Sequence, residues 1–138
     1  MARRLAQTLG HEFMAALTTA GVGVSDIDYV LCTHLHVDHV GWNCRLEDER
    51  WVPTFPNARY LMPAADEEIQ RARHSDLYVE SVLPVIEAEQ VELVEAGHKL
   101  GEHVTLIPAP GHTQGNVSGG SIRSHFLPDR HPSSRVPN

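Results

Sequence analysis

Two kinds of apolar spacing alternate along the chain. Between positions 5 and 17 the apolar residues recur at helical spacing, which predicts an amphipathic helix over residues 5–20. The sequence IDYVLCT that follows is a continuous run rich in β-forming residues, which predicts a buried strand at residues 27–33. Because strands and helices follow one another along the chain, we expect an α/β protein.

The middle of the chain continues this alternation. The elements expected there are a short helix opening at Asp38, a strand at 58–62, helices at 64–73 and 76–89, and strands at 91–96 and 104–108. Pro84 is expected to kink or divide its helix. The segment LEDERWVPTFPNA contains polar turn residues and two prolines. After about Asn116 the sequence is rich in Gly, Ser, Pro and Arg, and we expect loop or disorder.

Composition adds limits to this picture. With 138 residues and 41% hydrophobic content, the chain is sized for one globular domain with a modest core. A formal charge of −7 argues against a nucleic-acid partner, since phosphate binding relies on clustered cations. No run approaches the ~18 apolar residues of a membrane span, and MARRLAQTLGHEF has no apolar secretion signal. We therefore expect no membrane association and a cytoplasmic location.

The chain has two cysteines, which do not make a disulfide framework. Cys32 and Cys44 are expected to be free thiols that pack as small hydrophobic side chains. The alternative is a role for Cys44 near the histidine cluster described next.

Four potential metal ligands occur within six residues of the segment LCTHLHVDHVGWN, directly after the first expected strand. They are His34, His36, Asp38 and His39. In extended chain, His34 and His36 would point the same way with Cα atoms ~6.5–7 Å apart. Two such imidazoles can converge on one zinc at ~2.0–2.1 Å per bond. Asp38 and His39 follow where the chain turns into a helix, placed to face a second metal.

His112 is the next candidate, in the sequence LIPAPGHTQGN. Like the cluster, it follows an apolar strand, so both histidine-bearing loops are expected at carboxyl ends of strands. In open α/β sheets that edge is where ligands bind. His34, His36 and His112 would supply three nitrogen ligands and leave a fourth position for water, as in catalytic zinc sites. A metal so held lowers the pKa of its water to ~7.

These motifs resemble those of the metallo-β-lactamase superfamily. THLHVDHVGW is similar to its H-x-H-x-D-H motif and APGHTQGN to its G-H-T-x-G segment, and the resemblance covers about residues 5–118. THLHVDHVGWN with WVPTFPNARYLMP further resembles the branch of N-acyl-homoserine lactonases and methyl-parathion-hydrolase-like enzymes. The resemblance implies a partial αββα sandwich, a mixed sheet with flanking helices. It also implies hydrolysis of small-molecule esters, lactones or phosphoesters by a metal-bound hydroxide.

By this resemblance, the first metal would be held by His34, His36 and His112, and the second by Asp38 and His39. Asp38 is also the candidate catalytic residue. We expect one or two zinc ions, while iron, manganese or cobalt would also suit imidazole and carboxylate ligands.

The chain departs from the family pattern at both ends. Family members are about twice as long, and here the first strands and the later bridging Asp and final His have no match. Asp129 is a weak candidate for the bridging ligand, since it follows Pro128 and not Gly; His125 and His131 are weaker replacements. We therefore expect a partial domain over residues 1–118 and an irregular or disordered tail over 119–138.

Three hypotheses follow. The first is a metal-dependent, zinc-using hydrolase. The second is a truncated relative that binds metal without turnover. The third is an assembly module, because the strands at 27–33 and 104–108 would present exposed edges or faces that a homodimer or strand exchange could cover.

Overall fold

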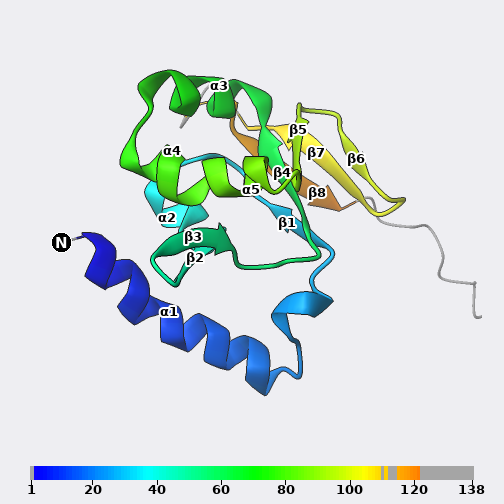
Figure 1. The fold of residues 1–138 in the computed structure, drawn as a ribbon. Helices are drawn as coiled ribbons and strands as arrows, with labels where there is room; N and C mark the ends of the chain where they lie inside the picture. Colours follow the sequence, from blue (N-terminus) through cyan, green and yellow to red (C-terminus); the bar gives the residue numbers. More distant parts are fainter. Residues whose placement is uncertain (1, 110, 112–114, 122–138) are drawn as a thin grey trace, which may run out of the picture.

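The computed structural model describes residues 2–109, 111 and 115–121 (Figure 1). The helices are α1 (Ala2–Thr19), the 3-10 helix η1 (Val24–Asp26), α2 (Val37–Val40), α3 (Ala64–Arg73), α4 (Asp76–Ser81) and α5 (Leu83–Glu87). The strands are β1 (Tyr29–Leu31), β2 (Cys44–Glu47), β3 (Arg50–Pro53), β4 (Arg59–Pro63), β5 (Val91–Val94), β6 (Lys99–Leu100), β7 (Val104–Pro108) and β8 (Val117–Ser121). The expected α/β class is confirmed.

The strands form three sheets. β1, β4 and β5 pair in parallel, with β4 central, so that Val30 lies opposite Tyr60 and Tyr60 opposite Val91. β2 and β3 form an antiparallel hairpin, and β6, β7 and β8 form an antiparallel sheet with β7 central. Parallel and antiparallel strands are therefore segregated into different sheets, with parallel strands in the sheet that carries the crossover helices.

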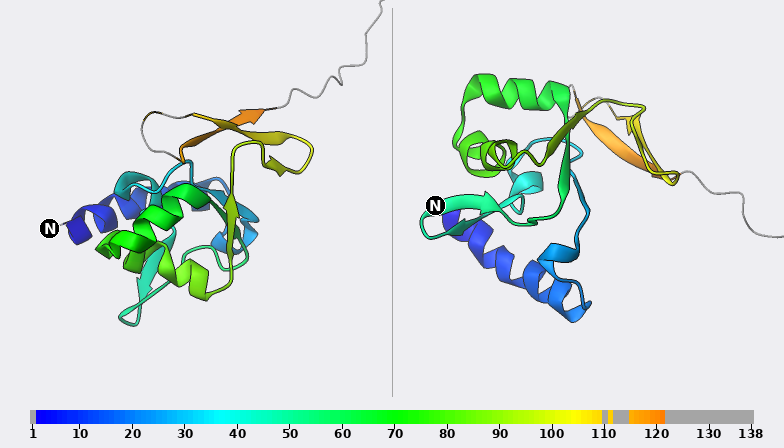
Figure 2. Two further views of the ribbon diagram at one scale, coloured as in Figure 1. Left: turned by 90° about the horizontal axis from the view of Figure 1, so that it is seen from above. Right: turned by 45° about the vertical axis from the view of Figure 1, so that its right-hand side comes forward.

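The parallel sheet lies between two other layers. In Figure 2 (right), helices α3–α5 and the sheet of β7 and β8 stand on opposite sides of β4. Side chains along β4 alternate accordingly: Tyr60 and Met62 pack in a core cluster with Tyr78 and Val82 of the helical layer. Leu61 points the other way, and its smaller cluster contains Val94, Leu106 and Val117. A strand with both faces covered has a continuous apolar run in its sequence, as YLMP of β4 does.

The hairpin of β2 and β3 was missed by sequence analysis, which interpreted its residues as turns. Its two-residue turn consists of Asp48 and Glu49, whose φ angles are +48° and +64°. Two successive positive φ angles match the twist of a tight hairpin, but the usual signals for it, Asn-Gly or Asp-Gly, are absent here. The turn that leads into the hairpin lies beside α1, where the ring centroids of Phe13 and Trp42 are 5.2 Å apart.

Most expected elements are present: α3 and β7 have the expected bounds, and those of α1 and β4 differ by one to three residues. The strand expected at 27–33 covers Tyr29–Leu31, and the short helix expected at Asp38 begins one residue earlier. The helix expected at 76–89 is divided at Val82, and Pro84 lies in the first turn of α5, where its missing N–H costs nothing. The two-residue strand β6 was not foreseen.

The expectation of loop or disorder after about Asn116 is wrong at its start. β8 runs from Val117 to Ser121, so residues 119–121 of the predicted irregular tail are strand. Gly and Ser are poor strand formers, but Val117 is buried between the sheets and β7 supplies a full pairing edge. Residues 122–138 lie outside the described residues.

The predicted exposed strands have different outcomes. β1 is an edge of its sheet within the described residues, as expected. β7 is not an edge, because β6 and β8 pair with both its sides, although Ile107 on it remains half exposed. Among the described residues, no helix is both long and apolar enough to cross a membrane.

Candidate functional site

The histidine-rich segment begins where β1 ends. The backbone N–H of Cys32 donates to the carbonyl of Leu61 at 3.0 Å and extends the pairing with β4 by one residue. The chain then bends at Thr33 and returns to extended geometry at His36, which caps α2 with φ −101° and ψ 159°. The short helix α2 comes next. Its first turn is closed by His39 and Val40, which both donate their N–H to the carbonyl of His36.

The structure brings three imidazoles together. The ring centroids of His34 and His36 are 4.9 Å apart, and those of His34 and His39 are 3.9 Å apart. Sequence reasoning expected His34 and His36 to face one metal and His39 another. In the structure His34 is the central ring of the three, because α2 turns His39 back over it. The assignment of each ring to a metal stays a prediction.

The members of the cluster differ in exposure. His34 is buried, with its Nδ1 3.2 Å from the hydroxyl of Thr33, and His36 is half-buried. Asp38 and His39 are exposed, and the Asp38 carboxylate lies 3.4 Å from Nε2 of His39. The cluster therefore has a buried inner imidazole and a polar, accessible outer side.

The donor chemistry of this cluster fits a metal such as zinc, since imidazole nitrogens and a carboxylate are its usual ligands. The described residues alone do not complete such a site: among them, no three His, Cys, Asp or Glu side chains are arranged to hold a metal ion. The third histidine of the predicted tripod, His112, lies outside the described residues. So do the weaker candidates Asp129, His125 and His131.

The ends of the loop that contains position 112 lie against the first loop. The N–H of Ala109 donates to the carbonyl of Asn116 at 3.0 Å and closes this second loop at its base. The N–H of Val117 donates to the carbonyl of Thr33, also at 3.0 Å. The base of the second loop is therefore one residue from His34, at the shared carboxyl edge of the strands.

A further link between the loops was missed by sequence analysis. Asp66 of α3 is buried, and its carboxylate accepts from the N–H of Leu35 at 3.0 Å and from the N–H of Gly115 at 3.2 Å. Gln70, one turn later, donates from its side-chain amide to the carbonyl of Leu35 at 2.9 Å. In sequence Asp66 is one of three acidic residues in the ordinary helix start AADEE, so only its position directly after a strand could have drawn attention.

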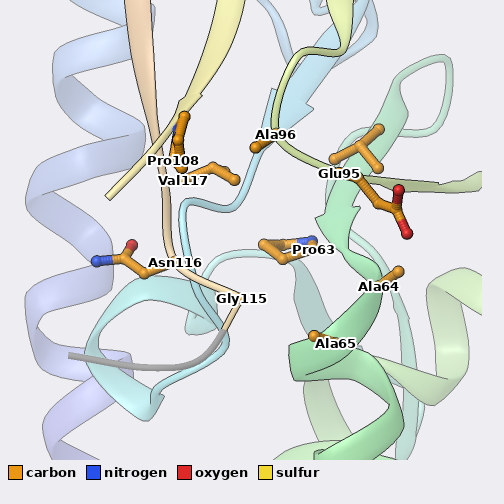
Figure 3. A pocket seen from close by; sticks show the side chains of 10 residues that line it. Pro63, Ala64, Ala65, Glu95, Ala96, Pro108, Gly115, Asn116 and Val117 are labelled. Atoms are coloured by element: carbon orange, nitrogen blue, oxygen red, sulfur yellow. The ribbon is translucent and has the colours of Figure 1, made fainter. Parts of the chain in front are cut away.

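A pocket of about 190 Å³ opens at the same edge. Its walls come from the carboxyl ends of β4, β5 and β7 and from the chain leading into β8. Figure 3 shows Pro63, Ala64 and Ala65 on one side and Pro108 and Val117 across from them. Glu95 is the one ionisable side chain among the ten residues that line it. The pocket confirms that this edge of the sheets is hollowed and largely apolar.

The two cysteines lie in the core. Both are free and buried, as expected, and the Sγ of Cys32 is 3.5 Å from Oδ1 of Asn43. Burial raises the pKa of Cys32 to about 11 and the pKa of Cys44 to about 12. Both thiols are thus protonated at neutral pH and pack against apolar neighbours. Cys44 belongs to the core cluster behind the sheet.

These observations define the class of protein. Residues 3–121 match the family described as the metallo-beta-lactamase superfamily, and the chain belongs to that family. The resemblance read from the two histidine motifs is thereby confirmed.

Among individual proteins, the chain is 30% identical over 103 residues to an N-acyl homoserine lactonase from Bacillus sp, covering 74% of this chain and 36% of the relative. It is 28% identical over 108 residues to the uncharacterized protein YobT from Bacillus subtilis (strain 168), covering 73% and 44%. The chain therefore spans less than half the length of these curated relatives.

Two solved structures share the fold. One is the hydrolase AbOPH of the beta lactamase superfamily, with a TM-score of 0.63, 20% identity and coverage of 77% of this chain and 40% of that one. The other is AidC, a dizinc quorum-quenching lactonase in complex with a product, with a TM-score of 0.56, 20% identity and coverage of 75% and 40%. The partial metallo-β-lactamase fold is confirmed.

Proposed function

We propose that this chain carries the ligand-bearing part of a metal-dependent hydrolase that acts on small-molecule ester, lactone or phosphoester bonds. The observation that carries the proposal is the gathering of three imidazoles at the hollowed carboxyl edge of the sheets. The ring centroids of His36 and His39 lie 4.9 Å and 3.9 Å from that of His34, and Asp38 lies beside His39. Family membership and the lactonase among the relatives support it and favour a lactone as the first substrate to try.

In this proposal the metal would be zinc, held by His34, His36 and His112, with Asp38 and His39 available to a second ion. When bound, zinc supplies a nucleophilic hydroxide at neutral pH and polarises the substrate carbonyl or phosphoryl group. The chain's own residues do the rest. The buried ring of His34 is fixed by its surroundings, while the exposed carboxylate of Asp38 can orient a water and take up its proton.

The substrate would enter over the apolar walls of the pocket, where Pro63, Pro108 and Val117 can cover the apolar part of a small ester or lactone. A cytoplasmic location and a homodimer also remain predictions. Tyr29 at the free edge of β1 is half exposed and would lie in such a dimer interface.

The test measures metal content and hydrolysis on the same protein. Purified without chelator and supplied with zinc, it should hold at least one ion per chain. It should hydrolyse a lactone, an aryl ester or a phosphotriester at pH 7–8, and lose this activity with a chelator. His36→Ala and His112→Ala should both lose metal and activity, whereas His103→Ala, an exposed histidine far from the cluster in sequence, should change neither.

The two alternatives give different results in this experiment. Zinc bound by all three histidines without any turnover would identify a non-catalytic metal-binding relative. Failure of the protein to bind zinc at all would overturn the proposed function. Sedimentation of a monomer across the micromolar range would count against the assembly hypothesis.

A further inference from the structure

Asp66 joins two loops that are far apart in sequence. One oxygen of its carboxylate receives the N–H of Leu35, 31 residues earlier, and the other receives the N–H of Gly115, 49 residues later. The side chain is 4% exposed. Hydrogen bonds to an ionised carboxylate are among the stronger ones in proteins. Here the bond from Leu35 is buried and the bond from Gly115 is partly buried.

The helix holds this carboxylate in a fixed place. α3 follows β4 with no intervening loop, so Asp66 lies in the first helical turn, where the helix dipole favours a negative charge. Gln70 lies one turn further on the same face. The backbone of Leu35 is therefore hydrogen-bonded on both sides: its N–H donates to Asp66 and its carbonyl accepts from Gln70. Leu35 lies between His34 and His36, so these two hydrogen bonds fix the backbone that carries both rings.

The contact on the other loop leaves no room for a side chain. A Cβ atom added at Gly115 would lie 2.9 Å from the carboxylate of Asp66 and 3.1 Å from its backbone nitrogen. Figure 3 shows Gly115 next to Ala65 at the start of α3. Glycine is thus required for the chain of the second loop to reach the carboxylate at this distance.

The adjacent residue provides a contrast. Glu67 is equally buried at 4%, but its carboxylate contacts the hydroxyl of Tyr78 at 3.4 Å and the guanidinium of Arg71 at 3.8 Å. Both partners belong to helices, and neither histidine-bearing loop is involved. Two neighbouring buried acids therefore serve different parts of the molecule.

We propose that Asp66 is a positioning residue for the metal site. It sets the distance between the loop of His34 and His36 and the loop that contains His112, and in this way it sets the affinity of the chain for its metal. The inference rests on the proposed function for the identity of the ligands. The two hydrogen bonds themselves do not depend on that function.

The test compares Asp66→Asn with Glu67→Gln. Asn can accept from only one of the two N–H groups, because its NH2 would face the other donor. Loss of such a supporting contact should weaken zinc binding by ~10-fold or more, measured by competition with a chromophoric chelator. Glu67→Gln should bind zinc within twofold of the parent. Amide hydrogen exchange, recorded without metal, should accelerate at Leu35 or Gly115 in Asp66→Asn alone.

A second variant approaches the same contact from the opposite side and remains informative if Asp66→Asn fails to fold. Gly115→Ala should also weaken zinc binding by ~10-fold, because the added methyl group displaces the carboxylate. Its matched control is Gly119→Ala, where an added Cβ meets nothing within 4 Å. This control should leave zinc affinity unchanged.

The outcomes separate the inference from the proposed function. If the parent binds zinc and both Asp66→Asn and Gly115→Ala bind it equally well, the positioning role is wrong and the proposed function stands. If the parent binds no zinc, the proposed function fails and so does the claim on metal affinity. The rates of amide hydrogen exchange at Leu35 and Gly115 then decide whether Asp66 holds the two loops together. Exchange rates in the variants equal to those of the parent would overturn this structural claim too.

Discussion

The histidine-rich segment has two halves that differ in exposure. Residues 32–35 are largely buried, and Leu35 is fully enclosed at 0% exposure. Residues 37–39 are exposed, with Val37 at 69%. The chain becomes buried again at Val40, so the exposed half is a short excursion between two anchored points.

The difference shows that one motif contains both a buried, firmly held segment and an exposed segment whose side chains are accessible. The first half is held from several sides, by the pairing of Cys32 with Leu61 and by the contacts of Leu35 with Asp66 and Gln70. The second half has a four-residue helix as its own support. In the proposed function, the first half would supply rigidly held ligands, and the second half would supply groups that reach water or a substrate.

Leu35→Ala should give the largest effect. Removing a fully buried leucine leaves a cavity and should lower the free energy of unfolding by ~2–5 kcal/mol, measured by urea denaturation. Val37→Ala, two residues away on the exposed half, should change it by less than ~0.5 kcal/mol. Equal losses in the two variants would show that the halves are not distinguished by packing.

Much of the fold was predictable because it follows from local pattern. Short stretches of sequence were enough to predict the apolar run YLM of β4, the helix of residues 64–73 and the division near Pro84. β8 was not, since its Gly and Ser residues form a strand only through pairing with β7. The hairpin was missed for a related reason: Asp48 and Glu49 adopt positive φ without the residues that normally mark such a turn.

The site divides in the same manner. His34, His36 and His39 were identified from spacing alone, and they do lie together. Their relative arrangement was not predictable, because it depends on the bend at Thr33 and the direction of α2. Nor was the role of Asp66, whose partners are 31 and 49 residues away in sequence. Contacts at that separation are set by how the layers pack, which one sequence does not display.

Alkaline pH should produce an effect of intermediate size. Burial keeps the Cys44 thiol protonated in the folded protein to a pKa of about 12, from an ordinary value of 9.0. Between these values the unfolded chain loses a proton that the folded chain keeps, so stability is complete below pH 9 and falls as the pH rises. The loss for this group should approach ~1.4 kcal/mol per pH unit, measured by urea denaturation at pH 8, 9 and 10.

Cys44→Ala is the control for this prediction. The variant should be less stable than the parent at pH 8, because a buried side chain is shortened, but its stability should fall less steeply between pH 9 and 10. The same slope in both proteins would mean that the thiol at position 44 is accessible to water. The buried region that adjoins the end of α2 would then be looser than the packing around Cys44 indicates.

Asp38→Asn should have the smallest effect on stability and tests the exposed half directly. The carboxylate is 73% exposed and its contact with His39 is 3.4 Å long, so its loss should change the free energy of unfolding by less than ~0.5 kcal/mol. Hydrolysis and binding of a second metal should nevertheless decline, because the proposed function assigns the carboxylate to the reacting side of the cluster. A large loss of stability with full activity would reverse this assignment. Asp38 would then belong to the structurally important half of the motif, and the boundary between the two halves would lie after residue 38.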